Sequence, residues 1–570
     1  MAQIVGIGVQ DFEKIRQRNI FYVDKTNFIR EWWEAEDDVT LIARPRRFGK
    51  TLNMSMLEKF FSERYAGRGE LFEGLKIWEE EKYRKLQGTY PVISLSFANV
   101  KERTYKAAVR KINQILVNLY SDHGNLLEKG VLDERARQFF DSVDVDMDEL
   151  TATMAIHQLS RYLFNYYHKK VIILLDEYDT PMQEAYLNGF WDELDSFIRN
   201  MFNAAFKTNP YLERAVMTGI TRVSKESIFS DLNNLKVVTT TSEKYGDCFG
   251  FTEEEVFAAL DEQGLADRKQ EVKQWYDGFT FGSRKDIYNP WSIINYLDKK
   301  KLGVYWVNTN SNSLIGKLIR EGSKETKQAM EDLLLGKKLV TEIDEQIVYN
   351  QLFQKRNGVW SLLLANGYLK VVGIEFVEWT GRTYYELELT NKEVRIMFED
   401  MIRDWFVPAE STYNDFIKAL LLGDVKAMNR YMNEVALRTF SYFDTGKNRP
   451  NGDSERFYHG FVLGLMVELA SRYVLTSNRE SGFGRYDVML EPKNPSDDGI
   501  ILEFKVQDEE DEEGLSDTVE AALRQIEEKQ YGAALAAKGI PEGRIRKYGF
   551  AFCGKKVLIG EAGLCGKSKC

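Results

Sequence analysis

Two strand-like runs near the end of the chain carry charged residues among apolar ones. Tyr486–Leu490 contains Asp487, and Ile500–Val506 contains Glu503 and Lys505. Because alternate residues of a strand project to one face, Glu503 and Lys505 point together, and a neighbouring strand would add Asp487. Two carboxylates with room for water suit Mg²⁺, and a lysine can position or help to deprotonate an attacking water. The alternative is a network of surface ion pairs on a sheet.

A second group of chemically capable residues is the loop RPRRFGKT, which follows the apolar run Val39–Ala43. Gly49 lets backbone amides converge on a phosphate, Lys50 reaches the β and γ oxygens, and Thr51 offers a hydroxyl to Mg²⁺. The first glycine of the usual pattern is absent, and Arg44 stands in its place. The loop predicts a binding site for the phosphates of a nucleotide.

Three further residues of this loop are predicted to belong to the same nucleotide site: Arg46, Arg47 and Phe48. The two arginines either add positive charge beside the phosphates or face solvent.

An acidic strand end, in the stretch VIILLDEYD, strengthens the nucleotide prediction. Asp176 can hold the same Mg²⁺, and Glu177 can orient or deprotonate the attacking water. The alternative is a strand that simply ends in an acidic turn. In the later stretch TGITR, Thr218 or Thr221 can polarise the γ-phosphate and Arg222 can neutralise developing charge. A helix cap explains Thr221 equally well.

The elements that must position these residues alternate along the first 250 residues. Apolar runs of the buried-strand type are separated by lengths that suit crossover helices, so we expect a parallel α/β sheet. The expected strands are Val39–Ala43, Pro91–Phe97, Val171–Glu177 and Arg214–Ile220.

The middle of the chain has a different pattern. Residues 252–335 are expected to be mainly helical. The run Leu362–Leu369 then leads into two alternating runs around the turn Thr380–Arg382, and another helix is expected over Lys392–Phe406. This order of elements fits a winged-helix-like module or an ordinary α+β connector.

A length of 570 residues suggests roughly three domains. The C-terminal part is expected to run helix, strand, strand, helix, strand. The predicted division is an N-terminal P-loop ATPase domain, a helical lid with a winged-helix-like region, and a C-terminal α/β domain, at residues 1–250, 251–407 and 408–570.

The composition sets further limits. The net charge of −11 argues against a broadly basic nucleic-acid surface, although it allows a local basic cleft. The longest apolar run is too short to span a bilayer, and the N-terminus has no basic segment followed by an apolar stretch. The four cysteines are scattered without a CxxC pair. We therefore expect a reduced, cytoplasmic protein.

Several segments in combination resemble the AAA-ATPase-like proteins of bacteria and archaea, in which an ATPase region precedes a C-terminal PD-(D/E)XK nuclease domain. The resemblance covers nearly the whole chain. It implies that the arginine-rich phosphate loop is typical of the family. The segments that carry the resemblance are Phe21–Thr26, Ala43–Thr51, Leu174–Pro181, Met217–Leu235, Trp275–Gly282 and Tyr288–Ile293.

The opening pair of runs fits the same resemblance, because Asp-x15-Glu-x-Lys is similar to the nuclease superfamily motif. Tyr486 occupies the position of the motif's proline, and that proline is often absent in the superfamily. The resemblance implies a C-terminal fold like that of restriction endonucleases. Gln525 resembles the glutamine that follows the Glu-x-Lys strand in many relatives, and Tyr531 is expected near the same cleft.

A carboxylate from the first helix of the nuclease domain usually joins such sites. Glu455 is preferred as the third metal ligand, and Glu468 is the alternative. His459 shares a helix face with Glu455 and either lines the site or is structural. Three more residues are expected to contact phosphate or to form a turn: Ser477, Asn478 and Arg485.

The resemblance implies a protein that binds and hydrolyses ATP and that carries a nuclease dependent on Mg²⁺, with Mn²⁺ as a substitute. DNA is the expected nucleic-acid substrate. The alternative is a nucleotide-dependent binding switch for a protein or DNA partner, with vestigial catalysis. A homo-oligomer is a further expectation, since related ATPases often complete their sites with a neighbour's arginine, although none can be assigned in this chain.

Overall fold

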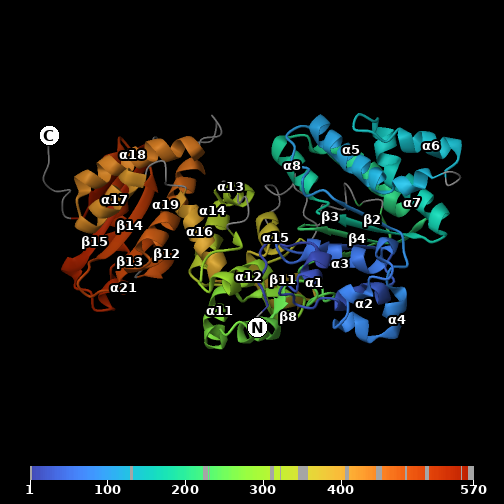
Figure 1. Ribbon diagram of the computed structural model, residues 1–570. Helices are drawn as coiled ribbons and strands as arrows, with labels where there is room; N and C mark the ends of the chain where they lie inside the picture. The colour runs from blue at the N-terminus through green and yellow to red at the C-terminus, as the bar shows by residue number, and fades with distance from the viewer. Residues whose placement is uncertain are drawn as a thin grey trace. The chain divides into compact units, whose positions relative to one another are not determined.

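The structure is a computed structural model, shown in Figure 1. The residues that it describes are 3–128, 132–221, 229, 232–307, 313–320, 322–344, 357–404, 410–443, 452–481, 484–507, 512–553 and 555–562. The chain forms two compact units, Met1–Ser311 with Gly336–Arg395 and Asn312–Leu335 with Ile396–Cys570. Residues 312–335 therefore pack with the C-terminal part of the chain. The three domain ranges given above stay predictions.

A parallel five-stranded sheet organises the first unit, in the order β2-β3-β4-β1-β5. The predicted parallel α/β sheet is confirmed, and its four predicted strands are found with shifts of one or two residues at their ends. The strand that carries Asp176 was expected beside the first strand, but β4 lies between β1 and β3. The strands are β1 Val39–Ala43, β2 Val92–Ser96, β3 Val171–Asp176, β4 Leu212–Gly219 and β5 Leu235–Val238.

Helices cover both faces of this sheet (Figure 1). α5 (Tyr105–Asp122) and α7 (Glu149–Tyr167) lie on one face, and α2 (Asn27–Ala35) and α3 (Lys50–Phe61) lie on the other. Both α5 and α7 begin at side-chain caps, because Thr104 and Asp148 accept backbone N–H groups of the first turn. On the α2 and α3 side, apolar side chains of the sheet and the helices form one core that includes Trp32, Phe61, Ile42, Ile172 and Val216.

Two smaller sheets follow in the first unit. The hairpin β10–β11 and the flanking helices α15 (Gly358–Ala365) and α16 (Lys392–Asp404) appear in the predicted order. Residues 252–335 are mainly helical, as expected, and the short sheet β6-β8-β7 is an addition to that expectation. Its strands span only two to five residues, which is too short for a clear alternating pattern. The strands are β6 Phe251–Thr252, β7 Phe279–Phe281, β8 Arg284–Tyr288, β9 Leu339–Thr341, β10 Leu369–Val377 and β11 Arg382–Leu389.

The first unit contains eight further α-helices within its described residues. They are α1 Phe12–Gln17, α4 Glu81–Leu86, α6 Glu134–Asp141, α8 Thr180–Asn188, α9 Trp191–Phe202, α10 Glu253–Glu262, α11 Lys269–Tyr276 and α12 Pro290–Lys299.

The second unit is built on a mixed sheet in the order β12-β13-β14-β15-β16, in which only β14 and β15 are parallel. The expected elements are present in their order, and the structure adds α17, α18, a third strand between α19 and α20, α21 and β16. The strands are β12 Tyr473–Ser481, β13 Gly484–Pro492, β14 Gly499–Val506, β15 Ile545–Cys553 and β16 Lys556–Glu561. The helices are α13 Ser313–Arg320, α14 Lys324–Leu334, α17 Glu410–Leu422, α18 Val425–Phe443, α19 Gly452–Leu469, α20 Leu515–Glu528 and α21 Ala533–Ala536.

The two faces of this sheet pack against different helices (Figure 1). Phe461 of α19 lies 6.3 Å, ring to ring, from Phe504 of β14. Ile501, on the alternate face of the same strand, packs in a cluster with Ile526 of α20. Glu503 therefore shares the α20 face, because it is two residues from Ile501. Within the described residues, every helix is too short or too polar to cross a lipid bilayer.

Candidate nucleotide and metal sites

The phosphate loop connects β1 to α3 through two residues in the left-handed backbone region. Arg47 has a φ of 64° and Gly49 a φ of 81°. Alternation of this conformation with right-handed residues makes backbone N–H groups converge on a concave surface that binds anions. Lys50 begins α3 and is 4% exposed, and its Nζ donates to the carbonyl oxygens of Arg44 and Pro45, both at 3.0 Å. The lysine therefore lies under the loop, with its ammonium group against the loop's own carbonyls.

Asp176, at the end of β3, is the centre of the nucleotide site. Its Oδ2 accepts a hydrogen bond of 2.7 Å from the Thr51 hydroxyl, and its Oδ1 accepts one from the Thr218 hydroxyl. Burial raises the pKa of this carboxyl, while the donated hydrogen bonds from Thr218 and Thr51 oppose that rise. Because β4 lies between β1 and β3, Thr218 fills the gap between the loop and the acidic strand end. Thr51 and Asp176, which are predicted to share a metal ion, are thus in direct contact.

Glu177 follows Asp176 with a φ of 54°, which is unusual for a residue with a side chain. The Thr180 hydroxyl donates to its Oε2 at 3.0 Å, and its backbone N–H donates to the Thr218 hydroxyl at 3.3 Å. Burial lowers the pKa of Lys50, and the negative charges of Glu177, Asp176 and Asp179 partly restore it. These contacts hold the Glu177 carboxylate at the same strand end as Asp176.

Asp179 is a further residue of this strand end that sequence reasoning missed. It is 3% exposed, and its Oδ2 accepts the backbone N–H groups of Ile220 at 2.8 Å and Thr221 at 3.0 Å. It therefore fixes the chain immediately after β4, and Thr221 is a hydrogen-bond partner of an aspartate. The signal in the sequence that could have identified Asp179 is that it is the third acidic residue of the stretch LLDEYD. Arg222 lies outside the described residues.

The other residues of the phosphate loop lie in different surroundings. The Arg44 guanidinium is fully buried, donates to the carbonyls of Thr239 and Lys244, and lies 4.4 Å from the ring centre of Phe281. Burial lowers the pKa of Arg44 to about 9. The arginine in the glycine position therefore stabilises the base of the loop and does not face the phosphate side.

Arg46, Arg47 and Phe48 differ in their surroundings. Arg46 is half-buried and donates to Gln183 Oε1 at 3.1 Å, while exposed Arg47 lies 4.2 Å from the ring centre of Trp291. The side chain of Phe48 is buried, and its ring lies 4.8 Å from the ring of Phe279. The backbone of Phe48 is therefore the part that can contact a phosphate bound by the loop.

The second candidate site lies where the β13–β14 ladder ends. The last paired residues are Val488 and Leu502. Beyond them, side chains replace the backbone pairing: the Phe504 N–H donates to Asp487 Oδ2 at 2.8 Å, and the Asp487 N–H donates to Glu503 Oε2 at 3.3 Å. The structure thus brings the two predicted carboxylates together.

Glu503 is the more buried of the pair, at 3% exposed. Its Oε1 accepts a hydrogen bond from the Gln525 amide, and that amide also donates to the Tyr531 hydroxyl at 3.1 Å. Burial and the negative charge of Asp487 raise the pKa of Glu503 to about 8, against the opposing effect of Lys505. Gln525 and Tyr531 therefore lie at the site, as the resemblance implied, and half-buried Lys505 is electrostatically coupled to it.

The third proposed metal ligand, Glu455 or Glu468, cannot be identified from side-chain contacts. The side chains of Glu455, His459, Asn478 and Arg485 lie outside the described part of the chain. Glu468 pairs with Arg403, with Nε and Oε1 3.3 Å apart.

The backbone nevertheless separates the two candidate glutamates. α19 packs on β12, which starts only three residues after the helix ends and runs in the opposite direction. The start of α19, with Glu455, is therefore at the end of β12 where β13 begins before Asp487. Glu468 is roughly 20 Å further along the helix axis. This favours Glu455 as the third ligand.

Ser477 has a structural partner. Its hydroxyl donates to Glu331 of α14, and both residues are buried. Their contact ties residues 312–335 to the sheet of the second unit, so Ser477 is engaged on the face opposite Glu503.

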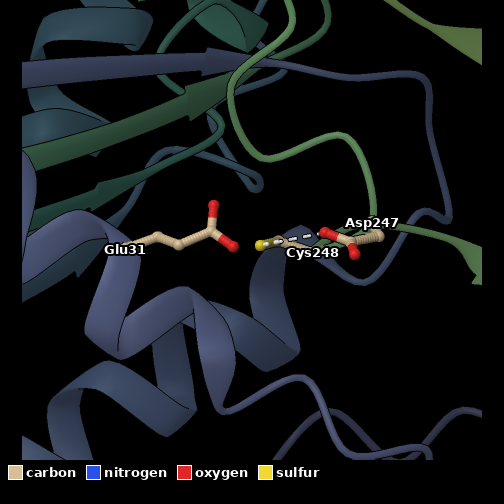
Figure 2. A group of neighbouring side chains, drawn as sticks. All are labelled: Glu31, Asp247 and Cys248. Atoms are coloured by element: carbon tan, nitrogen blue, oxygen red, sulfur yellow. Dashed lines mark hydrogen bonds between the residues drawn. The ribbon is translucent and has the colours of Figure 1, made fainter. Parts of the chain in front are cut away.

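Figure 2 shows another group of potential ligands, Glu31, Asp247 and Cys248. The Cys248 thiol donates to Asp247 Oδ1 at 3.9 Å, and Glu31 accepts a hydrogen bond from Asn27. Burial, with the charges of Glu31 and Asp247, raises the pKa of this thiol well above its usual value. Because metals bind the thiolate, these contacts fit a hydrogen-bonded group better than a metal site.

A second acidic group is only partly offset by a lysine, and burial together with the neighbouring Asp286 raises the pKa of Asp277 to about 7. It consists of Glu253, Asp277 and Asp286, and Lys273 contacts Glu253 and lies 3.8 Å from Asp286.

Divalent metal ions fit both predicted sites. In the phosphate site, the Thr51 hydroxyl and the Asp176 carboxylate are adjacent hard-oxygen donors. In the second unit, the raised pKa of Glu503 indicates two carboxylates whose negative charge lacks a sufficient counter-charge. A bound cation would supply it.

Comparison with known proteins finds a family match for each of the two regions that contain these sites. Residues 6–229 match the model of a predicted AAA-ATPase family, described as AAA-ATPase-like. Residues 453–562 match the model of the PD-(D/E)XK nuclease superfamily. The chain therefore carries an AAA-ATPase-like domain and, near its C-terminus, a PD-(D/E)XK nuclease superfamily domain. It is also 24% identical, over 94% of both chains, to an uncharacterized protein in the vnfD 5' region of Azotobacter chroococcum mcd 1.

Proposed function

We propose that this protein binds and hydrolyses ATP at the phosphate loop and that its C-terminal domain cleaves DNA in a metal-dependent reaction. The observation that carries the proposal is the 2.7 Å hydrogen bond between Thr51 and Asp176. It joins the end of the phosphate loop to an acidic strand end, and Mg²⁺-ATP requires both. The convergence of Asp487 and Glu503 supports the nuclease half of the proposal.

In the ATPase reaction, the loop amides and Lys50 bind the phosphates, and Thr51 and Asp176 hold the metal ion. Bound Mg²⁺ neutralises charge on the β- and γ-phosphates. Glu177 orients or deprotonates the attacking water from the end of β3. Arg46 and Arg47 add positive charge near the loop, and Phe48 contributes its backbone. Arg222 is retained as a candidate for neutralising charge in the transition state.

In the nuclease reaction, Asp487, Glu503 and Glu455 are the proposed ligands of Mg²⁺, with Mn²⁺ as a substitute. The bound metal stabilises negative charge on the phosphate and on the leaving oxygen. Lys505 orients the attacking water and helps to deprotonate it. Gln525 holds the Glu503 carboxylate in place through its amide.

The setting of these activities is part of the proposal. We assign the protein to the cytoplasm, in agreement with its four scattered cysteines. DNA and ATP are its proposed partners, and a homo-oligomer would allow a neighbouring subunit to complete the ATPase site.

A cleavage assay tests the proposal. Duplex, single-stranded and branched DNA are incubated with the full-length protein and Mg²⁺, with and without ATP. The wild type is expected to cleave at least one substrate, and the double variant Asp487→Ala/Lys505→Ala is expected to lose cleavage. Equal background from the two proteins on all substrates would contradict the nuclease assignment. Lys50→Ala serves as the matched ATP-site variant, and retained ATP binding would contradict the phosphate-loop assignment.

A second candidate function is a nucleotide-dependent binding switch with vestigial catalysis. It is favoured by the Lys50 ammonium, which already donates to two loop carbonyls. This candidate predicts that ATP raises the melting temperature of the protein without steady hydrolysis. Measured phosphate release at a steady rate that Lys50→Ala abolishes would exclude it.

A further inference from the structure

Two of the segments that carry the family resemblance, Trp275–Gly282 and Tyr288–Ile293, have no role in the proposed chemistry. The structure places both against the phosphate loop. The ring of Phe48 lies 4.8 Å from Phe279 and 5.4 Å from Phe281. Trp291 lies beside Arg47, at 4.2 Å from ring centre to guanidinium carbon. The loop is therefore held by residues more than 200 positions later in the chain.

The most specific of these contacts concern one backbone carbonyl. The Arg46 oxygen accepts hydrogen bonds from Trp306 Nε1 at 3.0 Å and from Asn289 Nδ2 at 3.3 Å. In a planar trans peptide the C=O and the next N–H point in opposite directions. Holding the Arg46 carbonyl therefore directs the Arg47 N–H to the other side of the loop. Arg47 is also one of the two left-handed residues that shape the anion-binding concavity.

Both donors are themselves fixed. Asn289 uses its side-chain oxygen to cap α12, where it accepts the N–H groups of Trp291 at 2.9 Å and Ser292 at 3.3 Å. Its amide nitrogen thus points to the loop in a defined orientation. The Trp306 side chain is fully buried, with ring distances of 5.3 Å to Phe279 and 5.4 Å to Tyr368.

A buried carboxylate holds the backbone of Trp306. Glu393, near the start of α16, is 1% exposed. Its Oε1 accepts the N–H groups of Tyr305 and Trp306, and its Oε2 accepts the Ser292 hydroxyl at 2.7 Å. Glu393 thus connects the Trp306 turn to the first turn of α12, the two elements that supply the donors to the loop.

We propose that Asn289, Trp306 and Glu393 are positioning residues that hold the phosphate loop in its nucleotide-binding shape. This inference rests on the proposed function only in requiring that the loop binds ATP. Aromatic packing alone would require the rings to be large and apolar. The positioning role requires the indole N–H of Trp306 and the amide NH₂ of Asn289. The two roles are separable because each donor can be removed while the packing or the helix cap is kept.

The test uses the full-length protein and a fluorescent ATP analogue. Trp306→Phe keeps an aromatic ring but lacks the N–H, and Asn289→Asp keeps the capping oxygen but lacks the NH₂. Each is expected to weaken binding by about 10-fold, and the double variant by at least about 50-fold, because each removes a donor to a buried carbonyl. Trp275→Phe is the matched control, since Trp275 contacts Tyr276 and Lys392 instead of the loop.

Tryptophan fluorescence gives a readout that simple destabilisation does not mimic. Nucleotide binding is expected to change the emission of the wild type and of Trp275→Phe, and at equal nucleotide occupancy this change is expected to be reduced in Asn289→Asp, which keeps every tryptophan. Melting temperatures without nucleotide establish that the variants are folded, and Glu393→Gln provides a further variant that leaves both donors to the loop in place. It is expected to weaken binding by less than Trp306→Phe.

Two results would overturn the inference in distinguishable ways. If the double variant binds within about twofold of the wild type while Lys50→Ala does not bind, the positioning role is wrong and the ATP site stands. If neither the wild type nor Lys50→Ala binds nucleotide, the proposed function fails and the inference fails with it.

Discussion

Asp176 in the AAA-ATPase-like domain and Glu503 in the nuclease superfamily domain are both almost fully buried, but their partners differ. Asp176 accepts hydroxyl hydrogen bonds from Thr51 and Thr218, and Lys50 lies near enough to affect its pKa. Glu503 accepts N–H donors from Gln525 and from the backbone of Asp487, while the Asp487 carboxylate adds a second negative charge.

The difference shows two ways to keep a carboxylate in a protein interior. In the first domain the protein supplies donors and a cation, so the acidic strand end is organised before any ligand binds. In the second, hydrogen bonds orient the carboxylates, and Lys505 only partly compensates the charge of the pair. The nuclease site is therefore expected to depend on its metal ion for charge balance.

The largest expected effect concerns the lysine beside the nuclease carboxylates. Lys505→Ala is expected to lower the DNA cleavage rate by about 10³-fold, the range for loss of a group that transfers a proton. Initial rates with saturating Mg²⁺ measure the change. Affinity for ATP is expected to stay at the wild-type value, because Lys505 belongs to the other domain. Cleavage at the wild-type rate would remove Lys505 from the reaction.

The next effect distinguishes the two candidate glutamates of α19. Glu455→Gln is expected to lower the cleavage rate by about 10²-fold through weaker metal binding. Glu468→Gln is expected to stay within about twofold, because it only breaks a partly exposed ion pair with Arg403. Rates measured over a Mg²⁺ titration compare the two variants. A large loss in Glu468→Gln with none in Glu455→Gln would reverse the assignment.

The charge imbalance of the nuclease site predicts a pH dependence. The pKa of Glu503 is raised in the folded state to about 8, so the folded state binds more protons than the unfolded state between about pH 4.5 and 8. The contribution of Glu503 to the free energy of unfolding is therefore fully present below about pH 4.5, and it is lost as the pH rises from about 4.5 to 8. In EDTA at pH 8, Glu503→Gln is expected to be more stable than the wild type by about 4 kcal/mol.

Calorimetric unfolding at pH 5, 6.5 and 8 checks this expectation, and Mg²⁺ should reduce the difference by compensating the carboxylates of the wild type. A wild type that becomes more stable than the variant as the pH rises in EDTA would contradict the sign.

The smallest expected effect tests the preformed site. Thr218→Val removes one of the two hydroxyl donors to Asp176 and is expected to lower the free energy of unfolding by about 1 kcal/mol. Thermal unfolding without nucleotide measures it. Thr180→Val is the comparison, since its hydroxyl donates to the less buried Glu177. No loss in Thr218→Val would mean that the protein does not need this donor to hold Asp176.

Local patterns predicted the parts of the molecule that depend on short stretches. The strands of the parallel sheet are contiguous apolar runs, and Thr51 and Asp176 are each recognisable beside such a run. The carboxylate pair followed from the alternation of strand side chains. These features depend on local periodicity and on the meeting of strand ends at one edge of a sheet.

The contacts that escaped prediction join distant residues. The buried setting of Arg44 depends on carbonyls 195 and 200 residues later. The bonds from Asn289 and Trp306 to Arg46 span 243 and 260 residues. No local pattern specifies which carbonyl an indole or an amide will reach. The packing of residues 312–335 with the second unit, through Glu331 and Ser477, was missed for the same reason.

The most direct test of the contrast between the two sites is calorimetric titration of Mn²⁺ into the nucleotide-free protein at pH 7, in two buffers of different ionisation enthalpy. The account predicts that Mn²⁺ binds at the nuclease site and displaces a proton from Glu503, so the apparent heat differs between the buffers. Binding should vanish in Asp487→Asn and persist in Asp176→Asn. Binding that survives Asp487→Asn, or that is lost in Asp176→Asn, would contradict the account.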